Sequence, residues 1–194
     1  GRILQEDIEL LAQPCGWLND SCVAYFMQWL SLILDLSPSP TVCQATGFVL
    51  MDPCAGFMLQ HEQDVDDIDL DSVGLDPANQ FIFLPVNNGD ICAESYSGTQ
   101  WSLLVWAPYG KLYTFDSSGS TNAASVKATA SGLVKYFLHS STSTKIILPE
   151  RVTQVLQRSA DVISVACPQQ QNGYDCGIFV CAFTEFLVST LRRV

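Results

Sequence analysis

Two strongly apolar segments, one near each end of the chain, enclose a central run of short strand-like segments. The first segment is Cys22 to Leu36 and the second is Gly177 to Leu191; both favour buried helices. Between them, apolar runs bounded by turn residues predict strands. The predicted strands are Phe81–Val86, Trp101–Trp106 and Lys111–Phe115. A hairpin turn at residues 108–110 would join the second and third of these strands.

The remaining segments complete an α+β pattern within one domain over residues 1–194. Leu4, Ile8 and Leu11 recur at helical spacing and predict a short amphipathic helix. Asn19 or Asp20 is suited to capping the apolar helix that follows. Further helices are expected over about residues 43–60 and over Ala123–His139, and further strands over Ile146–Leu148 and Val162–Ala166.

The charge of the chain limits its partners. The formal net charge is -11, which repels phosphate backbones, so we expect no nucleic-acid partner and favour one with a basic face. An acidic segment runs from Asp64 to Asp71. It lacks the Gly and the Glu of a calcium loop, so it is either a solvated loop or a docking surface for a basic partner. We expect no metal and no cofactor.

Neither a membrane span nor a disulfide framework is predicted. The apolar stretch from Cys22 to Leu36 is too short for a bilayer and contains Gln28 and Asp35. No signal peptide is seen, although a chain that opens with Gly1 is consistent with trimming. The eight cysteines form no CxxC pair, and several lie in apolar segments. Free thiols in a reducing compartment, the cytoplasm or nucleus, are therefore expected.

One cysteine lies where a nucleophile is favoured. The polar run from Gln170 to Gly177 places Cys176 directly before the last apolar helix. A cysteine in the first turn of a helix lies at the positive end of the dipole, which favours the nucleophilic thiolate. A buried structural cysteine is the alternative that this local pattern leaves open.

Four strings occur in order along the chain: Trp17–Asp20, Thr99–Val105, Phe115–Ser117 with Asn122 beyond it, and Gln171–Gly177. Together they resemble the sentrin-type proteases, which are cysteine proteases that process and remove ubiquitin-like modifiers. The similarity is closest to the deneddylase branch and extends from about Ile3 to about Leu187. It implies a papain-like fold of the ubiquitin-like-protease type.

The resemblance also implies a role for each matching residue. Cys176 matches the nucleophile, and Asp116 matches the carboxylate that orients the catalytic imidazole. Gln170 matches the side chain of the oxyanion hole, with the Cys176 N–H as its second donor. Trp17 and Trp101 match two indoles that close over the Gly-Gly tail of a substrate. Asp20 matches a family position near that tail. The alternatives are that Asp20 caps a helix and that each indole is a core residue.

The sequence departs from this pattern at one position. Gln100 stands where the family has histidine, directly before Trp101. A glutamine takes up no proton near neutral pH, so it can donate to Asp116 but cannot act as a base. Loss of a triad member costs about 10⁴- to 10⁶-fold in rate. The two histidines, His61 and His139, match no catalytic position and are expected to be structural.

Three explanations of Gln100 stay open: an engineered substitution, a natural loss that leaves a binding-only pseudoprotease, and a different base. We favour a deneddylase-type cysteine peptidase or isopeptidase whose activity is impaired in this chain. The alternative is a catalytically dead module that binds a ubiquitin-like protein. An acyltransferase on a related fold is a weaker option. The expected partner is a NEDD-type modifier first and a SUMO-type second, bound by a monomer.

Overall fold

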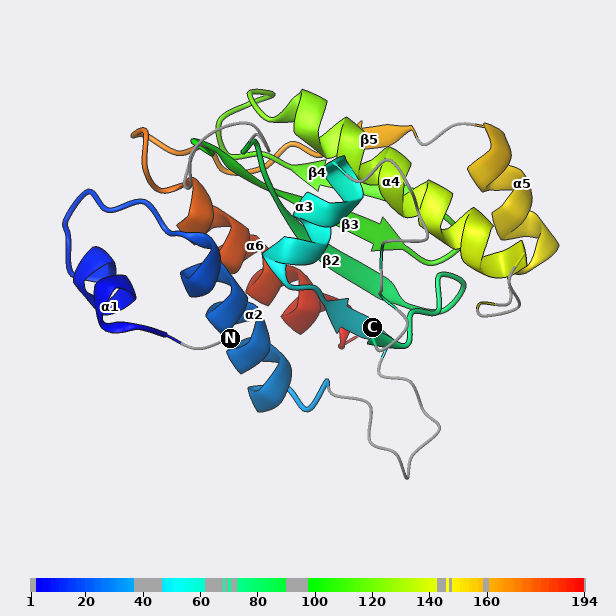
Figure 1. The fold of residues 1–194 in the computed structure, drawn as a ribbon, viewed down its shortest axis with the longest axis horizontal. Coiled ribbons are helices and arrows are strands. Elements are labelled where there is room, and N and C mark those ends of the chain that lie inside the picture. The colour runs from blue at the N-terminus through cyan, green and yellow to red at the C-terminus, as the bar shows by residue number, and fades with distance from the viewer. Residues whose placement is uncertain are drawn as a thin grey trace.

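The computed structural model describes residues 3–36, 47–61, 68, 70, 73–89, 98–142, 146, 148–158 and 161–193. Its helices pack around a central sheet (Figure 1). The predicted α+β class is confirmed. In chain order the elements are α1 (Gln5–Leu11), α2 (Asp20–Ile33), β1 (Phe48–Leu50), α3 (Pro53–His61), β2 (Phe81–Asn87), β3 (Trp101–Ala107), β4 (Lys111–Phe115), α4 (Ala123–Thr142), α5 (Glu150–Arg158), β5 (Val162–Ser164) and α6 (Cys176–Leu191).

The sheet is mixed, with its five strands in sequence order β1-β2-β3-β4-β5. The pairs β1–β2 and β4–β5 are parallel, whereas β2–β3 and β3–β4 are antiparallel. The hairpin between β3 and β4 turns through Pro108 and Tyr109, where the Gly110 N–H donates to the Ala107 carbonyl at 3.2 Å. Tyr109 has a φ of 69°, as the third position of a type II turn requires.

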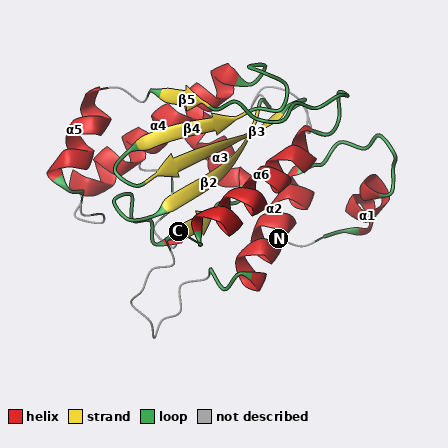
Figure 2. Ribbon diagram, turned by 180° about the vertical axis from the view of Figure 1, so that it is seen from behind, coloured by secondary structure: helices red, strands yellow, loops and turns green. Residues whose placement is uncertain are grey.

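Both faces of the sheet are covered by helices (Figures 1 and 2). Successive side chains of a strand point to opposite faces, so β3 divides its residues between two cores. Leu104 and Trp106 pack in the core formed with α3, α4 and α5. Trp101, Leu103 and Val105 pack in the core formed with α2 and α6. Burial on both faces explains why these strands read as continuous apolar runs.

The helices that flank the sheet begin where the sequence predicts. Asn19 caps α2, and its Oδ1 accepts from the Cys22 N–H at 3.0 Å. The α6 helix begins at Cys176, one residue before the predicted start. Its buried residues, among them Val180, Thr184 and Val188, recur at helical spacing. Both apolar segments are therefore helices that cover one face of the sheet.

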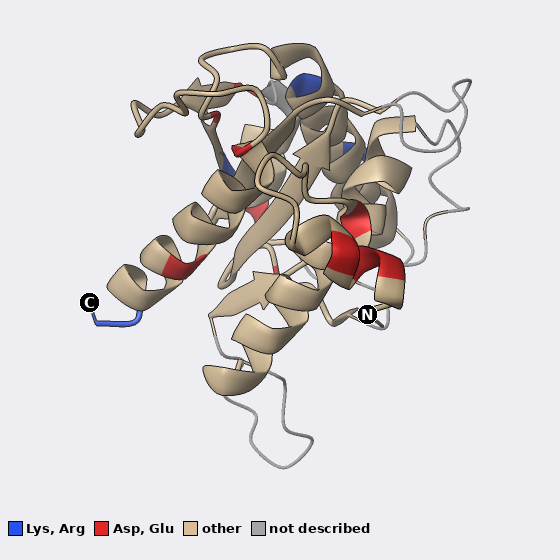
Figure 3. Cartoon of the chain, turned by 90° about the vertical axis from the view of Figure 1, so that its left-hand side faces the viewer, with Lys and Arg blue, Asp and Glu red and all other residues tan. Residues whose placement is uncertain are grey.

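The N-terminal helix is present, but its orientation is unusual. Ile8 and Leu11 are more than half exposed, whereas Asp7 is buried. The Asp7 carboxylate accepts from Asn19 Nδ2 at 2.7 Å and from the Leu4 N–H at 2.8 Å, and these bonds lower its pKa. Figure 3 shows acidic residues gathered on this helix. A hydrogen bond from Asn19 to the buried Asp7 carboxylate, rather than an apolar face, therefore ties α1 to the start of α2.

Three expectations about secondary structure were wrong. The segment after Gly47 forms strand β1 before helix α3, so no single helix runs to Gln60; residues 43–46 lie outside the described part. Parallel pairing of Phe48–Leu50 with β2 overrides the mixed helical pattern there. Ile146 and Leu148 pack against the core without forming a strand. Helix α5 was not anticipated, and β5 ends at Ser164 rather than Ala166.

The acidic residues from Asp64 to Asp71 lie outside the described part of the chain, so their role stays a prediction. Across the residues that the structure does describe, no helix combines the length and apolar character needed to cross a bilayer. This finding agrees with interpreting Cys22–Leu36 as a helix of the protein core.

The crossing of α3 and α4 depends on Gly132. A Cβ at this position would lie 1.9 Å from the Leu59 carbonyl oxygen. Alanine gains about 1 kcal/mol over glycine inside a helix, but overpacking costs roughly 1–3 kcal/mol and more against rigid backbone. We therefore expect Gly132→Ala to lower the free energy of unfolding by about 1–2 kcal/mol in urea denaturation.

The matched control is Ser131→Ala, one residue earlier on the same helix. Ser131 is only partly buried, and its replacement by alanine adds no atoms to the helix crossing. We therefore expect the free energy of unfolding to change by no more than about 0.5 kcal/mol. A Gly132→Ala chain as stable as this control would show that α3 can move aside without cost.

Candidate active site

The β3–β4 hairpin brings two of the predicted site positions together. Gln100 directly precedes β3, and Asp116 directly follows β4. Because the strands are antiparallel and Leu103 pairs with Phe115, the start of one strand lies beside the end of the other. Both side chains are buried, with 5% and 6% of their surface exposed. The site is therefore assembled at one end of the hairpin.

Gln100 contacts the carboxylate as the resemblance implies. Its Nε2 donates to Asp116 Oδ1 at 3.3 Å and to the Trp101 carbonyl at 3.1 Å. Its main-chain N–H donates to Asn88 Oδ1 at 2.9 Å. The amide thus occupies the place from which an imidazole N–H would donate to Asp116. It preserves this hydrogen bond and lacks a titratable nitrogen.

Asp116 is held by several further donors. Its Oδ1 accepts from the Ser118 N–H and from Ser118 Oγ, both at 2.9 Å. Its Oδ2 accepts from the Asn122 N–H at 3.2 Å. These bonds satisfy a carboxylate that is almost fully withdrawn from water. They fix it in the orientation that faces position 100.

Cys176 is the first residue of α6 and is 1% exposed. Burial raises the pKa of its thiol; the main chain of Trp101, Gly177 and Cys176 itself partly opposes this, and the charge of Asp116 adds to it. The start of a helix is expected to favour the thiolate, and burial of the side chain acts against that effect. The helix dipole is present, but desolvation outweighs it. Burial therefore favours the neutral thiol over the thiolate.

The Asp116 charge acts on Cys176, and so does the main chain of Trp101, the residue after Gln100. The structure therefore brings the predicted nucleophile, carboxylate and base positions into one site. No histidine is among the groups that shift the Cys176 pKa. His61 Nε2 lies 3.0 Å from the Gly89 carbonyl and its ring packs on Phe57, while His139 lies near the end of α4.

Gln170 is fixed beside the carboxylate turn. Its N–H donates to the Ser117 carbonyl at 2.8 Å, and its Oε1 accepts from Ser117 Oγ at 2.7 Å. Its Nε2 donates to the Asn172 carbonyl at 2.7 Å, which leaves the second amide hydrogen for another acceptor. The N–H of Cys176 has no intrahelical acceptor, because it lies in the first turn of α6. Both predicted oxyanion donors are thus available in part.

The two indoles differ in exposure. Trp101 is buried, and its Nε1 donates to the Leu18 carbonyl at 2.9 Å. Trp17, the neighbour of Leu18, is 42% exposed. A Cβ on Gly177 would lie 2.8 Å from the Leu18 Cβ, so the first turn of α6 packs closely against this segment. The Trp17–Leu18 segment is therefore held beside Trp101 by a hydrogen bond and beside Cys176 by packing against the first turn of α6.

Asp20 lies in the first turn of α2, where a carboxylate complements the helix dipole. Its pKa is raised by partial withdrawal from water and by the charge of Asp52, although the side chain remains exposed at its surface. Asp52 and Asp20 also contribute to raising the pKa of the Cys54 thiol to about 11, after burial. Asp20 thus belongs to an acidic group at the starts of α2 and α3.

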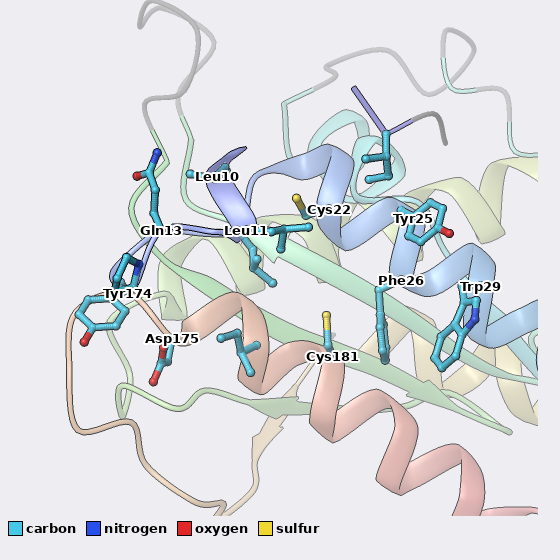
Figure 4. Close-up of a pocket in the computed structure, with 15 residues that line it drawn as sticks. Leu10, Leu11, Gln13, Cys22, Tyr25, Phe26, Trp29, Tyr174, Asp175 and Cys181 are labelled. Carbon is cyan, nitrogen blue, oxygen red and sulfur yellow. The ribbon is translucent and has the colours of Figure 1, made fainter. Parts of the chain in front are cut away.

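Two cavities lie next to the site. One of about 540 Å³ is mainly apolar and lies between α1, α2 and α6, with Tyr174 and Asp175 at one end (Figure 4). The other, of about 320 Å³, lies beside Asp116 and is also lined by Lys127 and Asp161. Neither is lined by Cys176. Within the described residues, no three His, Cys, Asp or Glu side chains are grouped as a metal site requires.

Sequence reasoning missed the polar residues that hold the loop before Cys176. Asn172 Oδ1 accepts from the N–H groups of Tyr174 at 3.1 Å and Asp175 at 3.0 Å, and its Nδ2 donates to the Asp175 carboxylate. An asparagine two residues before a tyrosine in a glycine-containing turn is a recognisable Asx-turn signal. Ser117 gave no such signal, because its partner Gln170 is distant in sequence.

The profile of the "Ulp1 protease family, C-terminal catalytic domain" matches residues 77–193, which is more than half of the chain. The chain belongs to this family. Its members and structural neighbours are cysteine proteases that act on ubiquitin-like modifiers. The sentrin-type resemblance is therefore confirmed.

Several known proteins are similar to nearly the whole chain. The probable sentrin-specific protease 8 of Dictyostelium discoideum is 29% identical over 98% of this chain and 73% of its own length. Sentrin-specific protease 8 of Rattus norvegicus is 28% identical over 97% and 76%. NEDD8-specific protease 1 of Schizosaccharomyces pombe is 28% identical over 96% of this chain and 40% of its own length.

Solved structures show the same fold. The SUMO protease Ulp1 with its catalytic cysteine oxidised to a sulfinic acid matches with a TM-score of 0.67 and 23% identity, over 97% of this chain and 74% of that one. The C-terminal Ulp1 protease domain in complex with Smt3, the yeast orthologue of SUMO, gives 0.66 and 24%, over 95% and 71%. The predicted ubiquitin-like-protease fold is confirmed.

The raised pKa of Cys176 leads to a test of thiol reactivity. Only the thiolate reacts with iodoacetamide, so the alkylation rate of Cys176 should be low at pH 7 and keep rising above pH 9. Gln100→His should move this rise to lower pH, because an imidazolium beside the thiolate stabilises it. Mass spectrometry of the peptide that contains Cys176 measures the rate, with Cys176→Ala as the blank. Rapid alkylation of the Gln100 chain at pH 7 would contradict a neutral thiol.

Proposed function

We propose that this Ulp1-type domain binds the C-terminal Gly-Gly tail of a ubiquitin-like modifier beside Cys176 and is a deneddylase-type peptidase or isopeptidase by descent. The hydrogen bond from Gln100 to Asp116 is the observation that carries the proposal. It keeps the site assembled while leaving no base to deprotonate the thiol. The chain with Gln100 should therefore bind its modifier and cleave it only slowly.

The position of Trp17 supports binding of the Gly-Gly tail. The Leu18 carbonyl is held by Trp101 Nε1, and Leu18 packs on Gly177 in the first turn of α6. The half-exposed indole of Trp17 is thus fixed near the buried thiol rather than on a remote surface. A slot roofed by aromatic rings admits glycines and excludes residues with a Cβ. This selectivity suits a Gly-Gly tail.

The names of the relatives bear on which modifier binds. Three of the relatives are called NEDD8-specific proteases, and the Ulp1 domain was solved with Smt3. We therefore propose a NEDD-type modifier as the first partner and a SUMO-type modifier as the second. The net charge of -11 is consistent with a basic docking face on that modifier. That the domain acts as a monomer and without nucleic acid stays a prediction from the sequence.

The proposed compartment is the cytoplasm or the nucleus. A thiol nucleophile must stay reduced to act, and reducing compartments maintain it. All six cysteines in the described part of the chain carry free thiols.

Trp17→Ala tests the tail-binding role. The change should weaken binding of the intact modifier in calorimetry by about tenfold or more, and leave binding of a modifier without its Gly-Gly tail nearly unchanged. Trp29→Ala is the matched control, because Trp29 is also 42% exposed but lies further along α2. Equal losses for the intact and the truncated modifier would show that Trp17 contacts the body of the modifier, not its tail.

Gln100→His tests whether the site is an impaired protease. With Cys176 as the proposed nucleophile, Asp116 as the proposed carboxylate and Gln170 as the proposed oxyanion donor, a base at position 100 should restore cleavage of a modifier with a fluorogenic C-terminal leaving group. A gain of about 10⁴- to 10⁶-fold is expected, which corresponds to roughly 5–8 kcal/mol of transition-state stabilisation.

The restored activity should disappear with Cys176→Ala and fall steeply with Asp116→Ala, which leaves the imidazole unoriented. A folded Gln100→His chain that binds the modifier but remains inert would favour the binding-only pseudoprotease. Substantial cleavage by the unmodified Gln100 chain would point to a different base.

A further inference from the structure

Asn122 is a nearly inaccessible polar residue next to the site, with 1% of its surface exposed. It immediately precedes α4, and its carbonyl accepts from the Val126 N–H at 3.0 Å, as the N-cap of a helix does. An N-cap asparagine ordinarily uses its side-chain oxygen to accept from the first turn of the helix. Here Asn122 Oδ1 has no hydrogen-bond partner within the described structure. The side chain is therefore not used as a cap.

The amide nitrogen of Asn122 faces the sheet instead. Its Nδ2 donates to two carbonyls, that of Val86 at 2.9 Å and that of Gln100 at 3.4 Å. Both acceptors are carbonyls, so the orientation of the amide is determined by its partners. The main-chain N–H of Asn122 donates to Asp116 Oδ2 at 3.2 Å. One residue thus connects β2, position 100 and the carboxylate.

A buried amide oxygen without a partner and a helix cap left unmade both reduce stability. A residue chosen only to begin α4 would avoid both. The arrangement is explained if the two contacts of Nδ2 matter more than the cap. One contact reaches the main-chain carbonyl of residue 100 and the other the carbonyl of Val86 on the neighbouring strand, so neither depends on which side chain stands at position 100.

We propose that Asn122 is a positioning residue for the reaction, which holds residue 100 at the distance from Asp116 and Cys176 that proton transfer requires. The inference rests on the proposed protease chemistry for its kinetic consequence. Its geometric consequence, the placement of residue 100 against Asp116, does not depend on that chemistry. Small displacements of a base are costly, since a shift of about 1 Å can lower a rate by about a hundredfold.

The test uses the full chain with Gln100→His, whose cleavage of the fluorogenic modifier is measured first. Adding Asn122→Ser keeps a good N-cap residue but removes the reach of the amide. We expect kcat to fall about ten- to a hundredfold and KM to stay within about threefold. An NMR titration of the introduced imidazole should show a lower pKa, because its contact with the Asp116 carboxylate is looser. Asn122→Gly, which also suits an N-cap, should give at least the same effect if the serine variant is unstable.

Thr129→Ala is the matched control, because Thr129 is fully buried on the same helix and its hydroxyl donates only to the Ser125 carbonyl. It should alter stability without moving kcat or the imidazole pKa. If Gln100→His is inert, the proposed protease function fails, and the titration still decides the role of Asn122. An imidazole pKa and, where activity exists, a kcat that match those of the Thr129→Ala control would overturn the assignment.

Discussion

The antiparallel pairing of β3 with β4 determines where the groups of the site lie. Because Leu103 pairs with Phe115, residues just before β3 and just after β4 meet at one end of the hairpin. The side chains of Trp101, Leu103 and Val105 then point to the core that contains α6, which brings the start of that helix to the same end. A change of register by one residue would send these side chains to the other face and separate Cys176 from Asp116.

Electrostatics within this site explain why position 100 matters more than its neighbours. Burial of Cys176 and the nearby charge of Asp116 both disfavour the thiolate. The main-chain groups around the thiol compensate only in part, and a neutral amide at position 100 adds no positive charge. An imidazolium there would neutralise the carboxylate and stabilise the thiolate at once. In the proposed chemistry, the enclosure of the thiol therefore disfavours the reactive thiolate when no cation stands at position 100.

Much of this arrangement could be predicted from the sequence, for identifiable reasons. The strands 81–86 and 101–106 are largely apolar on both faces, and 111–115 follows directly after a hairpin turn, so the local pattern was sufficient. Juxtaposition of positions 100 and 116 follows from the same hairpin. The short strand β1 could not be found, because its three residues depend on pairing with β2, not on local preference. The thiol's raised pKa was also missed, since burial of 99% of Cys176 arises from tertiary packing.

The position of Gln100 separates geometry from chemistry at this site. Its amide donates to Asp116 as an imidazole N–H would, so the carboxylate remains paired and the turn around it stays closed. An apolar residue at position 100 would leave Asp116 without that donor in a buried place, which is costly to the fold. Glutamine therefore keeps the interactions that hold the hairpin, Trp101 and the start of α6 together, and it supplies no titratable nitrogen. In the proposed function, recognition of a modifier depends on these retained contacts, whereas its cleavage depends on a base at position 100.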